Sequence, residues 1–302
     1  MPAVTRIIKR RIRSITNTRK ITKAMELVAA TKMRRAVNQV LETRSYANRA
    51  WDVVKDLAER TDPIQHPLLR SRESVKRIAV VIMSSNRGLC GGFNREIVEK
   101  SISYIKGAHQ RYGEVAVEVI LLGKRATEIA TKFGYPIVAE FQKADVANGI
   151  ADISAAARMV IQDFTSGKYD LVTILYTDYF SALKQTPHAW QLLPIQYPDN
   201  ELGMTKSAEE AKARDTSYEY LFEPSADEVL EQMLYRLIEI QIYQALLETN
   251  ASEHSARMMS MRNASDAAKD MIEDLTLTFN RARQASITSE IADIAGGKAA
   301  LE

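Results

Sequence analysis

Apolar residues recur with helical spacing through residues 225–295, a stretch of 71 residues that contains neither Gly nor Pro. Gly and Pro most readily end a helix, so this stretch predicts one helix of roughly 105 Å at 1.5 Å per residue. Alternating steps of three and four residues select sixteen positions, thirteen of them apolar: Leu230, Met233, Leu237, Ile240, Gln244, Leu247, Ala251, His254, Met258, Met261, Ser265, Ala268, Ile272, Leu275, Phe279 and Ala282. A seven-residue repeat of this length favours pairing in a left-handed supercoil over a helix inside a bundle, because helices of globular domains rarely exceed ~25 residues.

A second run without Gly or Pro extends over residues 3–62, between Pro2 and Pro63. One track of three-and-four spacing carries its apolar residues: Ile8, Ile15, Met25, Ala29, Ala36, Tyr46, Ala50, Val53 and Leu57. Polar residues interrupt the same track: Arg11, Thr18, Thr22, Lys32, Gln39 and Thr43. We predict that the two terminal helices pair antiparallel as a long coiled coil.

Between these helices the pattern changes to short apolar runs that alternate with helical stretches. We expect strands at residues 77–83, 115–122, 136–141, 171–176 and 190–196, and helices at residues 124–133 and 150–164. This alternation is typical of an open, mostly parallel α/β sheet. The predicted organisation is an N-terminal coiled-coil helix (1–70), a central α/β domain (75–200), a crossover loop (201–224) and a C-terminal coiled-coil helix (225–302). Ser225 is the expected helix cap, because Asp227 and Glu228 follow it.

Charge is distributed unevenly along the chain. Residues 1–49 contain thirteen Lys or Arg against two Glu, a net charge of +11, whereas the whole chain has a formal net charge of +3. Such an imbalance indicates an acidic partner. The single Cys excludes an internal disulfide and fits a reducing compartment, and no apolar run approaches the ~20 residues that cross a bilayer. We expect the basic beginning to belong to the mature protein, because its periodicity continues past any cleavage point.

The loop at residues 84–94, directly after a strand, is the strongest candidate for phosphate binding, since three glycines at a strand end could hold a phosphate. A P-loop requires Lys and Ser or Thr after its last Gly, but Phe93 and Asn94 follow Gly91 and Gly92. The dinucleotide pattern G-x-G-x-x-G is also absent. We therefore interpret the loop as a tight structural turn or a docking loop.

The remaining candidates for chemistry are weaker. Cys90 has no evident base beside it, and a lone Cys in apolar surroundings is usually a packing residue. The four histidines lie far apart without metal-ligand spacing, and His254 on the heptad track predicts a paired core histidine. The carboxylates are scattered over helix faces. The sequence thus predicts no catalytic, cofactor or metal site. An α/β nucleotide-binding enzyme with a helical oligomerisation arm remains the alternative.

Nucleic-acid and membrane-surface binding are both disfavoured. In a basic zipper the heptads follow directly from the basic region, whereas here they lie about 200 residues away. Few aromatic residues interleave with the basic ones, and the basic face lacks bulky apolar anchors.

Several blocks of sequence, in order along the whole chain, resemble the gamma subunit of F-type ATP synthases. The first is the helix at residues 12–33, with the sequence IRSITNTRKITKAMELVAATKM. The loop RGLCGGFN follows at residues 87–94, and YLFEP at 220–224. Near the end come Ser252-Glu253, Ala256-Arg257-Met258 and the sequence FNRARQASITSE at 279–290.

The resemblance implies a non-catalytic rotor subunit. In the family, the terminal helices form an antiparallel coiled coil that enters a ring of three alpha and three beta subunits. The α/β domain and lower coil bind the epsilon subunit and stand on the membrane ring of c subunits. Proton flow turns that ring, and the shaft drives the catalytic sites through different affinities. The resemblance implies no cofactor, no nucleic acid and no direct membrane insertion. It implies a peripheral location at the cytoplasmic face of a bacterial membrane.

The resemblance also implies roles for individual residues. Arg283 and Gln284 would touch a beta-subunit loop, and Met25 with Arg257 would lie near the lever that couples rotation to catalysis. Further partner contacts carried over from the family are Lys20, Lys23, Thr288 and Glu290. Tyr220 and Glu223 would lie on the side of the epsilon subunit and the c ring.

Overall fold

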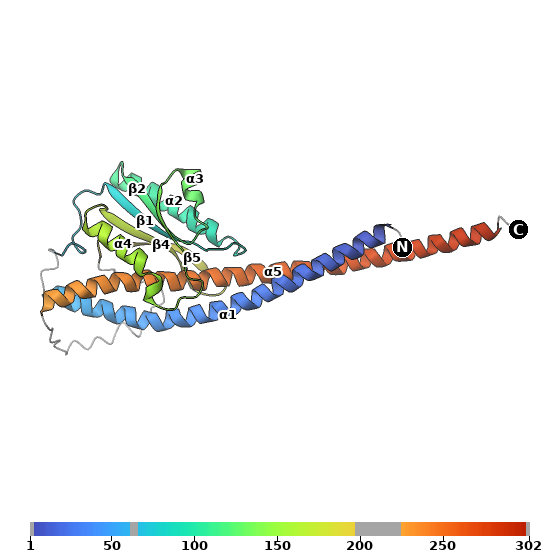
Figure 1. The fold of residues 1–302 in the computed structure, drawn as a ribbon, viewed down its shortest axis with the longest axis horizontal. Helices are drawn as coiled ribbons and strands as arrows, with labels where there is room; N and C mark the ends of the chain where they lie inside the picture. The colour runs from blue at the N-terminus through green and yellow to red at the C-terminus, as the bar shows by residue number, and fades with distance from the viewer. Residues whose placement is uncertain (1–2, 61–65, 197–224, 300–302) are drawn as a thin grey trace. The chain divides into compact units, whose positions relative to one another are not determined.

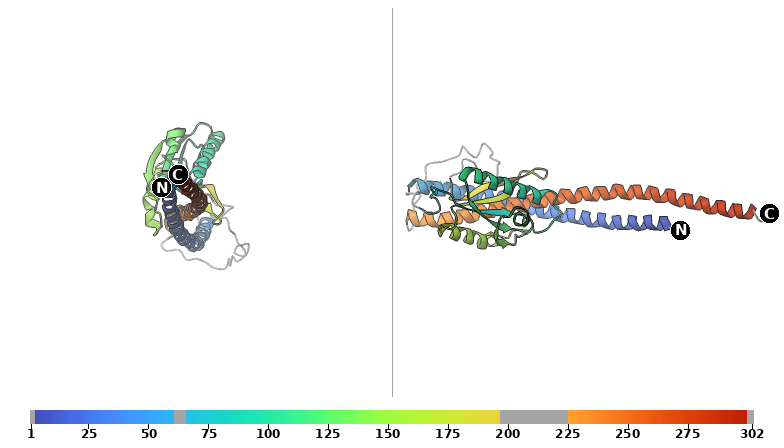
Figure 2. Two further views of the ribbon diagram at one scale, coloured as in Figure 1. Left: turned by 90° about the vertical axis from the view of Figure 1, so that its right-hand side faces the viewer. Right: turned by 90° about the horizontal axis from the view of Figure 1, so that it is seen from above.

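The computed structural model describes residues 3–60, 66–196 and 225–299 (Figure 1). The chain divides into two compact units: the terminal unit, residues 1–30 and 257–302, and the sheet unit, residues 31–256. Two long helices, α1 (Ala3–Arg60) and α5 (Ala226–Ala299), contribute to both units. Within each unit they lie side by side and run antiparallel (Figures 1 and 2). The four-part division drawn from the sequence stays a prediction, and its crossover at 201–224 lies outside the described residues.

The heptad track of α5 is confirmed. All sixteen positions from Leu230 to Ala282 are buried or half-buried. In the terminal unit the pattern is sharp, because from Ser265 to Ser286 the shielded residues follow one another at steps of three and four and those between them are exposed. The cap is confirmed too, since the backbone N–H of Glu228 donates to Ser225 Oγ at 3.3 Å.

Most of the apolar track expected for α1 is confirmed. Ile8, Ile15, Met25, Ala29, Ala36, Ala50 and Val53 are buried or half-buried, Tyr46 is exposed, and the side chain of Leu57 lies outside the described ones. In the terminal unit Arg11 and Thr18 are exposed, whereas Thr5 and Ile12 face inward. In the sheet unit Tyr46 is 55% exposed, whereas Val40, which is not on the track, is buried.

The sheet has five strands in the order β3-β2-β1-β4-β5. The strands are β1 (Arg77–Met83), β2 (Ala116–Leu122), β3 (Ile137–Phe141), β4 (Leu171–Tyr179) and β5 (Gln185–Leu193). The first four are parallel, and β5 pairs antiparallel with β4 at the edge. An open, mostly parallel α/β sheet is therefore confirmed.

Alternate residues of β1 enter two different cores. Ile78, Val80 and Ile82 pack with α2 (Phe93–Tyr112), which covers one face. Ala79, Val81 and Met83 pack with α4 (Ser154–Thr165) and with the long helices, which cover the other face (Figure 1). Both faces of the central strands are thus buried, as the continuous apolar runs indicated.

Some element bounds differ from those expected. Helix α2 was not among the elements predicted from the sequence. The helix expected from residue 124 begins later, as α3 (Glu128–Phe133), because the backbone N–H groups of Lys124 and Arg125 donate to Ser85 O at 3.1 and 3.0 Å. Residues 150–164 begin with a 3-10 turn (Ile150–Asp152) before α4. The last strand lies earlier than predicted, and Pro187 within it fits an edge strand.

Candidate functional site

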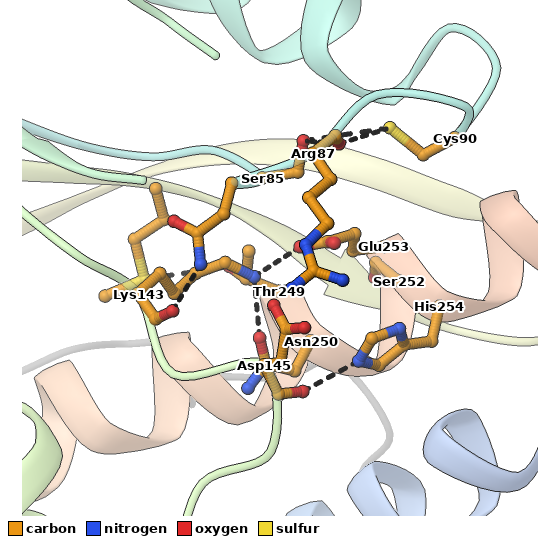
Figure 3. A network of polar contacts seen from close by, with 12 residues as sticks. Ser85, Arg87, Cys90, Lys143, Asp145, Thr249, Asn250, Ser252, Glu253 and His254 are labelled. Carbon is orange, nitrogen blue, oxygen red and sulfur yellow. Dashed lines mark hydrogen bonds and ion pairs between the residues drawn. The ribbon is translucent and has the colours of Figure 1, made fainter. Parts of the chain in front are cut away.

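Helix α5 is buried on every side between Ile240 and Ser255, where Tyr243 alone is only half-buried. Nine of these residues are polar or charged: Gln241, Gln244, Glu248, Thr249, Asn250, Ser252, Glu253, His254 and Ser255. Burying so many polar groups is costly unless they form hydrogen bonds. Within the described residues, the side-chain oxygens of Gln241 and Gln244 are buried without such a partner. We call these nine residues and their partners the polar junction; it lies wholly in the sheet unit (Figure 3).

The polar junction lies across the carboxyl ends of the parallel strands. Thr249 Oγ1 lies 3.7 Å from Sδ of Met83, the last residue of β1, and Ser252 Oγ donates to Thr177 O near the end of β4 at 3.1 Å. In open α/β sheets, ligands bind in the crevice outside these strand ends, where the strand order reverses. Here that reversal lies between β1 and β4. Side chains of α5 therefore contact the strand ends that border the usual ligand crevice.

Lys143, which follows β3, makes the most deeply buried ion pair of the junction. Its Nζ lies 2.5 Å from Glu253 Oε2 and donates to Asn250 Oδ1 at 2.6 Å, and the Lys143 and Glu253 side chains are 0% and 2% exposed (Figure 3). Asn250 also donates, through Nδ2, to the carbonyl of Ala144 at 3.1 Å. Adjacent turns of α5 thus hold the loop after β3.

Asp145 continues this contact toward α1. Its carboxylate accepts a hydrogen bond from Lys32 Nζ at 3.2 Å, and its backbone oxygen lies 2.8 Å from His254 Nε2. Burial raises the pKa of Asp145, but the hydrogen bond and charge of Lys32, with the charges of Arg87 and His254, outweigh burial and lower it. His254 is 2% exposed, so the prediction of a paired core histidine is confirmed.

Glu248 holds three other elements. Its Oε1 accepts from Arg44 Nη2 of α1 at 2.7 Å and from Gln244 Nε2 at 3.1 Å, and its Oε2 accepts from the backbone N–H of Tyr179 in β4 at 3.0 Å. The Glu248 side chain is fully buried. A charge-assisted set of this kind fixes α1, α5 and β4 to one another within the sheet unit.

Asp178 is another buried carboxyl group and lies near Glu248. Burial is the largest cause that raises the pKa of Asp178, and the negative charge of Glu248 adds to it. The hydrogen bond from Tyr176 and the charges of His188 and Arg44 act in the opposite direction without cancelling the rise. Asp178 therefore holds a proton more readily than an ordinary Asp.

The glycine-containing loop after β1 forms a turn stabilised by its own residues. Ser85 Oγ donates to Arg87 O at 2.6 Å, and Asn94 Nδ2 lies 2.8 Å from Ser85 Oγ and 3.2 Å from Cys90 Sγ. Cys90 is 1% exposed, as expected of a packing residue. Gly91 has a φ of 58°, a conformation that favours glycine. The loop thus has the geometry of the predicted structural turn.

The structure brings most of the predicted partner-contact residues into the terminal unit, which contains Lys20, Lys23, Met25, Arg257, Arg283, Gln284, Thr288 and Glu290. Met25 and Arg257 are half-buried and the other six are exposed. Lys23 pairs with Glu26 at 2.9 Å. Tyr220 and Glu223 lie outside the described residues. The roles of all ten remain predictions.

No role was predicted for the central residues of the polar junction, Lys143, Glu248 and Asn250. One signal was present: residues 237–256 of α5 contain no Lys or Arg, although they include three Glu. A long helical stretch without cations is unusual for a solvated helix and indicates burial.

The described residues contain neither a metal site nor a membrane-spanning helix. No group of three or more His, Cys, Asp or Glu side chains there is arranged to hold a metal ion. Within the same residues, no helix combines the length and apolarity needed to span a bilayer.

Comparison with known proteins gives a match over nearly the whole chain. A family model described as ATP synthase matches residues 4–301. The ATP synthase gamma chain of Herpetosiphon aurantiacus is 42% identical, with 99% of each chain covered, and that of Heliobacterium modesticaldum is 43% identical, with both chains fully covered. Among solved structures, a chain of the Euglena gracilis mitochondrial ATP synthase (OSCP/F1/c-ring) aligns with a TM-score of 0.63 at 18% identity, covering 99% of this chain and 94% of that one. A chain of the Tetrahymena thermophila central stalk and c-ring aligns with a TM-score of 0.57 at 23% identity, covering 81% of this chain and 99% of that one.

These solved chains share the fold of this chain, in which long terminal helices accompany a mostly parallel sheet. The level of identity to the curated relatives is high enough to identify the family as well. The chain belongs to the ATP synthase gamma chain family.

Proposed function

We propose that this chain is the rotating central-stalk subunit of an F-type ATP synthase and couples proton flow through a membrane c ring to ATP synthesis. Membership of the gamma chain family over residues 4–301 is the observation that carries the proposal. The partners would be three alpha and three beta subunits around one copy of this chain, with an epsilon subunit and the c ring. The complex would hold the chain peripherally at the cytoplasmic face of a bacterial membrane.

The terminal unit supports a role as a shaft. From Ser265 to Ser286 its heptad seam shields one stripe of α5 while the residues between are exposed, and past Ser286 every described side chain up to Ala295 is exposed. A helix pair held by one continuous seam resists bending and twisting. Arg283 and Gln284 on this exposed surface would contact a beta-subunit loop, and Met25 with Arg257 would lie near the coupling lever. Lys20, Lys23, Thr288 and Glu290 would make further contacts with the surrounding subunits.

The weak character of exposed ion pairs suits a rotating contact. Interactions between solvated charges are worth about 0–1 kcal/mol, so they exchange readily, whereas desolvated pairs would hold a rotor in one pose. The surface cations of α1 therefore fit transient contact with acidic loops. The shaft would couple the c ring to the distant catalytic sites by favouring particular conformations of those sites.

The chemistry itself would belong to the partner subunits, and this chain would have no active site of its own. Support comes from the polar junction, where α5 side chains contact the ends of β1 and β4 that border the usual ligand crevice. Tyr220 and Glu223 would face the epsilon subunit and the c ring.

Co-expression with alpha and beta subunits tests the proposal. We expect one copy of this chain in each ring of three alpha and three beta subunits, measured by native mass spectrometry, and no ATP binding by the free chain below millimolar concentration. Submillimolar ATP affinity in the free chain would instead favour an α/β enzyme with a helical arm.

A charge reversal adds a functional measurement. Arg283→Glu should lower ATP synthesis by the reconstituted complex, whereas Arg111→Glu, an equally exposed reversal on α2, should not. Equal rates for the two variants would contradict the role given to Arg283.

A further inference from the structure

A cleft in the sheet unit lies where the chain enters β1, apart from the polar junction. Its volume is about 1040 Å³, and it is lined by residues 69–74, by Lys76 and Arg77 at the start of β1, and by Asp170 just before β4. None of the residues to which the proposed function gives a role lines it.

The cleft carries an excess of positive charge. Arg70, Arg72, Lys76 and Arg77 line it and are all exposed, against only two carboxylates. One of these, Asp170, accepts hydrogen bonds through Oδ2 from the backbone N–H groups of Lys76 and Arg77 at 2.9 and 3.0 Å. Within the part of the chain that the structure describes, none of the four cations forms an ion pair. The cleft therefore presents cations without neutralising partners in that part of the chain.

Two of the guanidinium groups contact neighbouring residues of the sheet unit. Arg77 Nη2 donates to Gly167 O at 2.5 Å, and Arg72 Cζ lies 5.8 Å from the centre of the Phe164 ring. Phe164 is fully buried, so the ring that supports Arg72 is itself fixed. Cations that are positioned before binding lose less conformational entropy when an anion arrives.

We propose that this cleft binds an acidic segment of a partner protein, with carboxylates facing the cations and an apolar side chain against Leu69. The volume lies just above the range of small-molecule sites, roughly 300–1,000 Å³, and all four cations are exposed rather than buried. A membrane surface fits less well, because binding to it requires bulky apolar anchors and the lining offers only Leu69. The inference does not depend on the rotary function.

Fluorescence anisotropy of the full chain with a labelled peptide of about ten residues, rich in Glu and containing Leu, tests this proposal. We expect saturable binding that weakens when salt rises from about 50 to 200 mM, because salt screens solvated charges. The matching peptide with Gln in place of Glu should not bind. Peptide binding that saturates but is unaffected by charge removal in the cleft would overturn the proposal.

The test variant removes three of the cleft cations together: Arg70→Gln, Arg72→Gln and Lys76→Gln. Arg77 is kept because it bonds to the Gly167 carbonyl. Each exposed charge pair contributes a few-fold in affinity, so the triple variant should bind the peptide about tenfold more weakly.

A matched variant removes three exposed cations elsewhere in the sheet unit: Lys100→Gln, Lys106→Gln and Lys124→Gln. It has the same net charge as the test variant, and its affinity should change by less than about twofold. An equal loss in both variants would show an effect of net charge alone and would overturn the proposal. A third outcome would also overturn the proposal. In it the peptide does not bind, but pyrophosphate or vesicles containing anionic lipid do, and their binding is lost in the test variant.

Discussion

Replacement of Lys143 by Met tests how strongly the polar junction holds α5 to the sheet. Lys143 and Glu253 are 0% and 2% exposed at their side chains, and their charged atoms lie 2.5 Å apart. Removing one member of a buried ion pair leaves the other charge uncompensated and costs about 3–5 kcal/mol in the free energy of unfolding. For a domain of about 150–250 residues each kcal/mol lowers the melting temperature by roughly 2–4 °C, so the melting temperature should fall by about 6–20 °C.

Urea unfolding followed by tryptophan fluorescence measures this loss. Lys143→Met combined with Glu253→Leu should recover part of the stability, because neither charge then remains buried alone. Lys124→Met, at an exposed lysine, should stay within about 0.5 kcal/mol of the original chain. The reasoning is refuted if Lys143→Met costs less than about 1 kcal/mol, or if the costs of the two single changes simply add in the double variant.

Four further predictions concern the shaft, two carboxylates of the sheet unit and a turn. Ala268→Pro in the α5 seam should remove a helix hydrogen bond, cost about 3 kcal/mol or more, and abolish rotation-coupled ATP synthesis in the reconstituted complex. The pKa of Asp145 is lower in the folded protein than in the unfolded chain. Its contribution to stability is therefore present above its unfolded pKa and is lost as the pH falls through its folded pKa. Asp145→Asn should lower the unfolding free energy at pH 7. The pKa of Asp178 is higher in the folded protein than in the unfolded chain, so the ionised side chain opposes folding. Stability should therefore increase as the pH falls through the folded-state pKa of Asp178. Asp178→Asn should raise the unfolding free energy at pH 7. Gly123→Ala should destabilise by roughly 1–3 kcal/mol in urea unfolding, because its φ is +100° and a Cβ would lie 2.2 Å from a backbone oxygen.

Each of these has a comparison that isolates its cause. Gly107→Ala, in the middle of α2 with no atom within 4 Å of the added Cβ, should stabilise by about 0.5–1 kcal/mol. Ala268→Ser keeps the helix hydrogen bond and should preserve coupled synthesis; undiminished synthesis with Ala268→Pro would contradict the shaft. Asp145→Asn and Asp178→Asn should shift stability at pH 7 in opposite directions, and shifts of the same sign would disprove the charge argument.

The long helix and its seam could be predicted because their signals are local. Absence of Gly and Pro allows the helix, and the seven-residue repeat marks the side that pairs, so all sixteen positions of α5 are shielded. The inner stripe of α1 was less clear in the sequence, because polar residues occupy part of its track and two of them, Arg11 and Thr18, are exposed. Tyr46 fitted the spacing, yet it is 55% exposed.

The polar junction could not be predicted from local pattern. Lys143 lies 107 residues from Asn250 and 110 from Glu253, and the sequence around Lys143 does not indicate which residues it contacts. Helix α2 was missed for a different reason: its buried residues share the segment with many charges and with Gly107, which lowers helix propensity. Placement of His254 succeeded because its position on the seam already implied burial.

Burial of α5 on all sides between Ile240 and Ser255 fixes the rotation of this helix about its own axis. A shift of one residue would turn it by about 100° and slide it by about 1.5 Å. Glu248, Asn250 and Glu253 would then all leave their partners at once, and two carboxylates would be buried uncompensated. This stretch of α5 therefore cannot rotate independently of the sheet, and a torque applied to it is transmitted to the strands.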